Sequence, residues 1–342
     1  MVKYVMGVDI GGTKSHLALF DAEGNFVDFD RWGCLNHEGL PGSFAQFEDE
    51  FGQLLTRVIN RNKITMKDVA FSVLGVGGVD TVKQHSIISE ILRKLGFERF
   101  ILANDAFLGI PAGSETGTGI CAINGTGCTL AGINKEGKML QIGGVGVISA
   151  DMGGGATLGG RLVSAVYREL FRKGEATFMT SLLFEKLGIT SKYDFVERIY
   201  EKTDDGSFDF HTCGRLVFEA VKRNDPVAAG ILREIAANYS GGISCMIEEL
   251  RFPPGEELCV VLAGSIFVKG EHPFLIDSLK EQVSGENPRH RVRYNVLNVP
   301  NVAGAVIWAL NTHNGTNINR DKVCAQLREK KQENHGGHGV SW

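Results

Sequence analysis

The chain carries the same hairpin pattern twice, once in each half. Residues 12–28 read GGTKSHLALFDAEGNFV, and residues 125–141 read GTGCTLAGINKEGKMLQ. The two copies match at Gly12 with Gly125, Thr13 with Thr126, Leu17 with Leu130, Ala18 with Ala131, Glu23 with Glu136 and Gly24 with Gly137. Each copy follows a short apolar run and predicts a strand, a Gly/Thr turn, a second strand and a polar turn. We therefore expect a duplicated domain whose two polar turns face inward and can hold a polyphosphate between two lobes.

Composition limits the partners and the compartment of the protein. The 342 residues suffice for two ordinary domains, and 43% hydrophobic with 22% charged residues is typical of a globular protein. A net charge of −4 predicts no nucleic-acid partner. No apolar run approaches the roughly 18 residues of a membrane span, and Asp9 interrupts the first apolar run, so neither a membrane partner nor a signal peptide is expected. Seven cysteines without a CxxC pair indicate reduced thiols and a cytoplasmic location.

Strands alternate with helices in both halves, which predicts an α/β fold with covered sheets. In the first half we expect strands at 3–9, 15–20, 69–76 and 100–103, and helices at 44–61 and 86–95. In the second half we expect a hairpin at 119–142, helices at 157–172 and 226–250, and a strand at 258–262. The predicted organisation is a first lobe at 1–112, a second lobe at 113–302 with a helical insertion at 174–225, a helix at 303–330 that completes the first lobe, and a flexible tail at 331–342.

The two repeated turns are the candidate phosphate sites. The first consists of Gly11, Gly12, Thr13 and Lys14, and the second of Gly125, Thr126 and Gly127. Glycines allow a tight turn whose N–H groups point at an anion, while Thr13 and Lys14 add a hydroxyl and a positive charge. The alternative is a bare hairpin turn, but the presence of two matching copies favours the phosphate role. Asp9 is a candidate for binding magnesium through water, or else a turn-capping carboxylate.

Patterns of other nucleotide-binding classes are missing. The chain has no GxxxxGK[ST] pattern, so a P-loop ATPase is disfavoured. A GxGxxG pattern between a strand and a helix is also absent, which disfavours a dinucleotide oxidoreductase.

Three further positions carry candidate chemistry. Asp105 follows a short buried strand, where a carboxylate can accept the proton of an attacking hydroxyl, or cap the next helix. Asp151 is the one charged residue of the Gly-rich stretch 143–160, which suits the hydroxyls of a small polar substrate; the alternative is a flexible linker. Gly264 and Ser265 follow an apolar strand, where small residues let a nucleotide base lie against the backbone, or simply pack closely.

In order, these motifs resemble those of the actin-like ATPase superfamily, which includes sugar kinases, heat-shock 70 proteins and actin. The resemblance rests on the following segments: MGVDIGGTKS and INGTGCT as two phosphate motifs, ANDA at 103–106 and VPNVAGAV at 299–306 as connecting motifs, and VVLAGSIF at 260–267 as the adenosine motif. It covers nearly the whole chain. It implies two ribonuclease H-like lobes around a central cleft, with ATP and Mg²⁺ as cofactors.

Within that superfamily the chain is similar to N-acetylglucosamine kinase and the BadF/BadG ATPase family. The pair Asn36 and His37 and the segment GGVGVISADMGGG carry this likeness. It implies an ATP-dependent kinase of an amino sugar, with Asp105 as the base that deprotonates the sugar 6-hydroxyl. Asn36 and Asp151 are then sugar contacts, and so are Thr126, Gly127 and Thr129. The resemblance also implies a homodimer.

Some residues depart from the kinase pattern and leave alternatives open. Val145 and Met152 replace a tryptophan and a glutamate, and Cys128 replaces a serine, so N-acetylglucosamine, N-acetylmuramic acid and glucosamine all remain candidate substrates. A second hypothesis is the ATPase activator of a dehydratase, which holds an iron–sulfur cluster between subunits. Its cysteine stands just before GTG, whereas Cys121 here precedes GTG by four residues. A third hypothesis is a non-catalytic sensor of a sugar or nucleotide.

Overall fold

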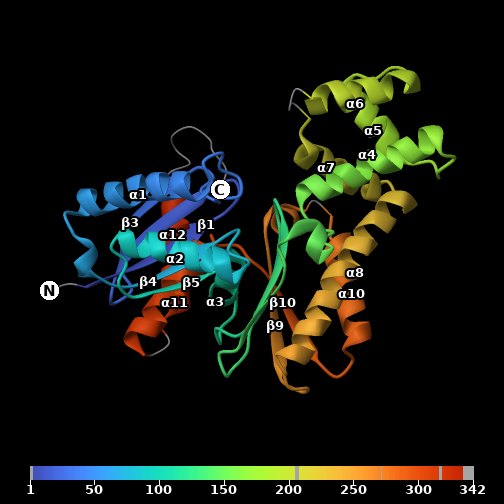
Figure 1. Cartoon of the computed structure of the whole chain (residues 1–342). Coiled ribbons are helices and arrows are strands. Elements are labelled where there is room, and N and C mark those ends of the chain that lie inside the picture. The colour runs from blue at the N-terminus through green and yellow to red at the C-terminus, as the bar shows by residue number, and fades with distance from the viewer. Residues whose placement is uncertain (1–2, 205–207, 271, 316–317, 334–342) are drawn as a thin grey trace.

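The computed structural model describes residues 3–204, 208–270, 272–315 and 318–333. These residues form two lobes, each built around a five-stranded sheet (Figure 1). The blue and cyan N-terminal segments and the red C-terminal helices make up one lobe, and the green to orange segments make up the other. The α/β class predicted from the sequence is confirmed.

The first sheet has the strand order β3-β2-β1-β4-β5. Its strands are β1 Tyr4–Ile10, β2 Ser15–Asp21, β3 Phe26–Trp32, β4 Val69–Val76 and β5 Phe100–Ala103. The first three strands are antiparallel neighbours, while β4 and β5 run parallel to β1. Strand β4 is a nearly continuous apolar run. Helices α1 Ser43–Asn62 and α2 Val82–Lys94 cover one face of the sheet at this strand, and α11 Val302–Asn314 covers the other, so side chains on both faces are buried.

The second sheet repeats this plan with the order β10-β9-β6-β7-β8. Its strands are β6 Gly119–Asn124, β7 Cys128–Ile133, β8 Met139–Gly143, β9 Glu257–Ala263 and β10 Arg291–Val296. As in the first sheet, an antiparallel meander occupies one side, and two strands parallel to its first strand occupy the other. The identical order and direction confirm the duplication that the repeated hairpin predicts.

Helices cover the outer face of each sheet. On the first sheet, α1 Ser43–Asn62 and α2 Val82–Lys94 pack their apolar faces into a core that includes Phe47, Ile88 and Met6. On the second sheet, α8 Pro226–Glu249 and α10 Phe274–Glu286 pack side by side. The other helices of this lobe are α4 Gly155–Phe171, α5 Phe178–Leu187, α6 Phe195–Asp204, α7 Phe210–Lys222 and α9 Ser265–Lys269. Helices α5 to α7 fall within residues 174–225, where a helical insertion is predicted, and stand away from the sheet in Figure 1.

A middle layer lies between the two sheets. It contains η2 Asp105–Leu108, α3 Gly109–Gly113 and α11 Val302–Asn314, and its buried core draws residues from both sheets. Helix α11 approaches its neighbours so closely that a Cβ at Gly304 would lie 1.8 Å from the Leu108 carbonyl oxygen. A Cβ at Gly7 of β1 would likewise lie 2.6 Å from Val306 Cγ2. Glycine is therefore required at the contact of α11 with η2 and at the contact of β1 with α11.

The C-terminal segment corrects one sequence prediction. The helix expected at 303–330 is two helices, α11 and α12 Arg320–Glu333, because Gly315 adopts φ +68° and ends α11. Helix α12 also enters the tail expected at 331–342, whose remaining residues 334–342 lie outside the described residues. The lobe boundaries at 112 and 302 stay predictions. Within the described residues, no helix is long and apolar enough to cross a membrane.

Candidate active site

The two repeated turns face each other, one from each lobe. The first is closed by the Gly11 N–H, which donates to the Lys14 carbonyl at 3.1 Å. The second is closed by the Gly125 N–H, which donates to the Gly127 carbonyl at 3.0 Å. A Cβ placed on Gly12 would lie 3.7 Å from Thr126 Cγ2, so the turns nearly touch. A ligand between them would meet both turns at once.

The second turn adjoins two helix starts. The Gly155 N–H at the beginning of α4 donates to the Gly125 carbonyl at 2.9 Å. Gly125 also lies against the segment that begins α9, since a Cβ on it would be 3.6 Å from Gly264 Cα and 3.7 Å from the Ser265 nitrogen. The structure thus brings the second predicted phosphate turn together with the predicted adenosine motif. The dipole of α4, whose first residue lies at this turn, favours an anion at this point.

Asp9 lies near the end of β1, immediately before the first turn. Its cross-strand partner is His16, whose Nδ1 is 3.4 Å from Asp9 Oδ2. Among the described residues, no group of three or more His, Cys, Asp or Glu side chains could hold a metal ion by itself. Mg²⁺ is commonly held by one or two carboxylates together with substrate phosphates. Asp9 therefore fits a metal ion that arrives with a nucleotide rather than a resident metal cage.

Asp105 follows β5 at the start of η2, at the carboxyl end of the parallel strands. Helix capping falls to its neighbour, because Asn104 Oδ1 accepts the Ala106 N–H at 2.9 Å. Burial raises the pKa of the Asp105 carboxyl to about 7, and the negative charges of Asp9 and Asp80 add to this rise. Asp105 is therefore available for proton transfer near neutral pH.

Asn36 and Asp105 both lie beside Gly77, in the turn that follows β4. A Cβ on Gly77 would lie 3.5 Å from Asn36 Nδ2 and 3.6 Å from Asp105 Oδ2. Asn36 Oδ1 accepts the Glu38 N–H at 2.9 Å, which fixes the orientation of its amide. The structure thus brings these two predicted substrate contacts together within the first lobe.

Asp80 is a site residue that the sequence reasoning missed. The Asn104 amide donates to Asp80 Oδ1 at 2.9 Å, and the Gln141 amide of β8 donates to the same oxygen at 2.5 Å. Gln84, which caps the start of α2, also accepts the Asp80 N–H at 3.1 Å. Burial raises the pKa of Asp80. A signal was present: like Asp105, Asp80 is a carboxylate at the end of a buried parallel strand.

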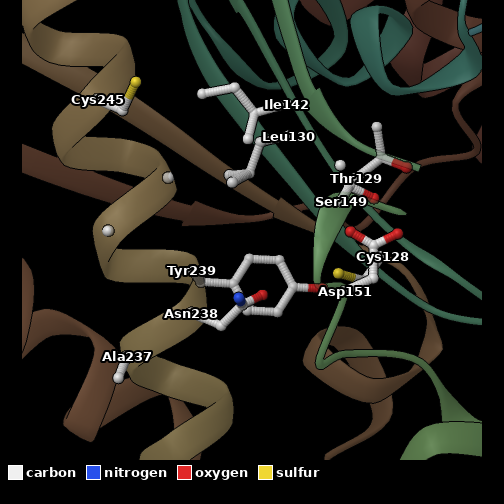
Figure 2. A pocket seen from close by; sticks show the side chains of 13 residues that line it. Cys128, Thr129, Leu130, Ile142, Ser149, Asp151, Ala237, Asn238, Tyr239 and Cys245 are labelled. Carbon is white, nitrogen blue, oxygen red and sulfur yellow. The ribbon is translucent and has the colours of Figure 1, made fainter. Parts of the chain in front are cut away.

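Asp151 organises the Gly-rich loop of the second lobe. Its Oδ2 accepts the N–H groups of Gly144 at 3.0 Å and Gly146 at 2.8 Å. A Cβ on Gly144 would lie 3.0 Å from Thr129 Oγ1 and 3.1 Å from Asp80 Oδ1. The Asp151 loop therefore adjoins Asp80, and Asp80 is linked through Asn104 to the Asp105 segment. Asp151 and Thr129 also line a pocket of about 390 Å³ beside α8 (Figure 2).

Two lobes of identical strand order, with paired Gly/Thr turns at the cleft between them, define an actin-like ATPase fold. The chain belongs to the BadF/BadG/BcrA/BcrD ATPase family, whose model matches residues 6–309.

Related proteins match over most of their lengths. The chain is 25% identical over 309 residues to N-acetylmuramic acid/N-acetylglucosamine kinase of Clostridium acetobutylicum, covering 90% of this chain and 98% of the relative. It is 27% identical over 318 residues to N-acetyl-D-glucosamine kinase of Dictyostelium discoideum, with the same coverage.

Solved structures share the fold. A Chromobacterium violaceum protein described as an N-acetylglucosamine kinase matches with a TM-score of 0.63 at 21% identity, covering 89% of this chain and 98% of that one. A glucokinase of the ROK family from Streptomyces griseus, in complex with glucose and AMPPNP, matches with a TM-score of 0.53 at 16% identity, covering 96% of this chain and 100% of that one.

Proposed function

We propose that the protein is an ATP-dependent kinase that phosphorylates the 6-hydroxyl of an amino sugar of the N-acetylglucosamine type. The observation that carries this proposal is Asp105, a carboxyl with a pKa of about 7 beside Asn36, at the carboxyl ends of parallel strands. The two relatives with about a quarter of their residues identical are both kinases of N-acetylated amino sugars, which supports the same substrate class.

In the proposed reaction, Asp105 acts as the general base. The sugar oxygen forms a bond to the γ-phosphorus of ATP, the bond from that phosphorus to the bridging oxygen of the β-phosphate breaks, and ADP leaves. The proton of the attacking hydroxyl passes to the Asp105 carboxylate. A base is most effective when its pKa lies near the working pH, and the raised pKa of Asp105 meets this condition.

The nucleotide phosphates are proposed to lie between the repeated turns. The N–H groups of Gly11, Gly12, Gly125 and Gly127 with the hydroxyls of Thr13 and Thr126 supply donors, and Lys14 supplies charge. The start of α4 adds its dipole behind the second turn. Mg²⁺ bound with ATP would be held on the Asp9 side and would neutralise phosphate charge. Gly264 and Ser265 are proposed to flank the adenosine.

The sugar is proposed to lie between Asn36 and Asp105 of the first lobe and Thr129, Gly127 and Asp151 of the second. The Asn36, Asp105, Thr129 and Asp151 side chains offer amide, carboxylate and hydroxyl groups to sugar hydroxyls, and Gly127 offers its backbone N–H. Because they come from both lobes, a bound sugar would favour closure, and closure excludes water from the transferred phosphoryl group.

Replacement of Asp105 tests the mechanism. Asp105→Asn keeps the size of the side chain but removes the proton acceptor, so sugar-dependent ADP release with N-acetylglucosamine should fall by about two to four decades. Sugar binding, measured by calorimetry, should survive the change. Phosphorylation at the wild-type rate by Asp105→Asn would show that Asp105 is not the base.

The two alternative functions, an iron–sulfur ATPase activator and a non-catalytic sensor, predict different properties of the purified protein. Cys121 is fully buried, and burial raises the pKa of its thiol, which argues against a cluster shared between subunits. An iron–sulfur activator would nevertheless give brown protein with visible absorbance after anaerobic purification. A non-catalytic sensor would bind sugar or nucleotide but release no ADP with any sugar of a panel.

A further inference from the structure

The pocket beside α8 has one wall of small residues. Helix α8 contributes Ala237, Gly241 and Gly242. A Cβ on Gly242 would lie 2.3 Å from Leu130 Cδ1, so the helix packs closely on the sheet there, whereas the space beside Gly241 is open. The opposite wall is Leu130 of β7 and Ile142 of β8, whose side chains point toward α8 in Figure 2. A volume of about 390 Å³ exceeds what one or two water molecules require and falls in the range of small-molecule sites.

One end of this pocket is polar, and the rest is apolar and uncharged. Asp151, Thr129 and Ser149 line one end, together with Asn238, which extends from α8 toward Asp151 in Figure 2. Among the described residues that form the lining, Asp151 is the one charged side chain, and no lysine or arginine contributes. A group that enters past the polar end should therefore be uncharged and largely aliphatic, with hydrogen-bonding atoms near its point of attachment.

We propose that this pocket receives the N-acyl group of the amino sugar. The inference rests on the proposed kinase function, because the pocket shares Thr129 and Asp151 with the proposed sugar contacts. The amide of the acyl group would face Asn238 and Ser149, and its aliphatic chain would extend along Ile142 into the open space beside Gly241. The volume exceeds the needs of an acetyl group, so N-propanoyl and N-butanoyl glucosamines are substrates as well.

Gly241 offers a way to fill the pocket without disturbing the fold. It lines the pocket, and a Cβ added to it would meet no atom within 4 Å. Gly241→Leu therefore narrows the pocket. Gly230→Leu is the matched control: Gly230 lies on the same helix, also has no atom within 4 Å of an added Cβ, and does not line the pocket. Both changes replace glycine inside a helix and raise helix propensity equally.

The test compares kcat/KM for glucosamine, N-acetylglucosamine and N-butanoylglucosamine. In wild type and Gly230→Leu, kcat/KM for the butanoyl sugar should lie within about tenfold of kcat/KM for the acetyl sugar. Gly241→Leu should lower kcat/KM for the butanoyl sugar by about 10- to 200-fold, the range for steric misfit of a methylene-sized group, and leave glucosamine within about twofold. Equal effects of Gly241→Leu on all three sugars, or no effect, would overturn the pocket assignment.

Calorimetry keeps this test separate from the kinase proposal. If no sugar supports ADP release, the proposed kinase function is wrong. Binding of N-butanoylglucosamine then tests the pocket assignment by itself. Binding that Gly241→Leu weakens at least tenfold and Gly230→Leu leaves unchanged supports the assignment. Absence of binding to wild type, or equal binding to both variants, overturns it.

Discussion

At the scale of single residues, the Asp105 carboxyl lowers the stability of the native state at neutral pH. Its pKa is about 7 in the folded protein and 3.8 as the unperturbed value. Well below pH 3.8 the carboxyl is protonated in both states, so folding has no penalty there. As pH rises toward 7, the unfolded chain releases this proton while the folded chain retains it, and stability falls. Asp105→Asn should therefore raise the free energy of unfolding at pH 8 by on the order of 2–4 kcal/mol, with little gain at pH 4.

Urea denaturation at pH 4 and pH 8 measures this difference. Asp68→Asn is the matched control, because hydrogen bonds from Thr65 lower the pKa of Asp68, the opposite direction. That variant should gain no stability at pH 8. If wild type and Asp105→Asn have the same free energy of unfolding at pH 8, burial of the Asp105 carboxyl does not destabilise the native state.

At the scale of elements, Gly264 between β9 and α9 packs closely against the second repeated turn. It adopts φ +86°, and a Cβ would lie 2.4 Å from the Asn124 carbonyl oxygen. Gly264→Ala should therefore lower unfolding free energy and raise KM for ATP, because the displaced segment carries Gly125 with it. Gly255→Ala is the control: its φ is +87°, but an added Cβ meets nothing within 4 Å. It should cost only about 1–2 kcal/mol of backbone strain and leave KM for ATP unchanged.

Elements differ in how well the sequence predicts them. Strands β4 and β5 have their predicted bounds because each is a nearly continuous apolar run. Strand β10 was missed because it is an edge strand of sequence RVRYNV, whose charged residues hide the strand pattern. The repeat predicted two facing turns, since Gly and Thr recur in both copies. Asp80 has no counterpart in that repeat, and its partner Gln141 is distant in sequence, so only the folded chain brings them together.

At the scale of the whole molecule, the duplicated lobes meet through two kinds of contact. The apolar middle layer around α11 and η2 is buried and close-packed. We therefore expect this contact to stay in place and to act as the hinge when the lobes move. Near the candidate site, the contact is instead polar and small: the Gln141 amide of the second lobe donates to Asp80 of the first. A polar contact of this kind can break and reform at little cost, so opening of the cleft is expected at this end.

The Asp80–Gln141 pair can be inverted to test this mode of closure. Gln141→Glu places two carboxylates together and should open the cleft at pH 8, which increases the radius of gyration in X-ray scattering and raises KM for the sugar. Asp80→Asn combined with Gln141→Glu restores an amide that donates to a carboxylate, while the amide oxygen introduced at position 80 can still accept from Asn104. Both measurements should then return toward wild-type values. If the double variant keeps the radius of gyration and the KM of Gln141→Glu, the Asp80–Gln141 pair does not control closure. The effect of Gln141→Glu then comes from the added charge alone.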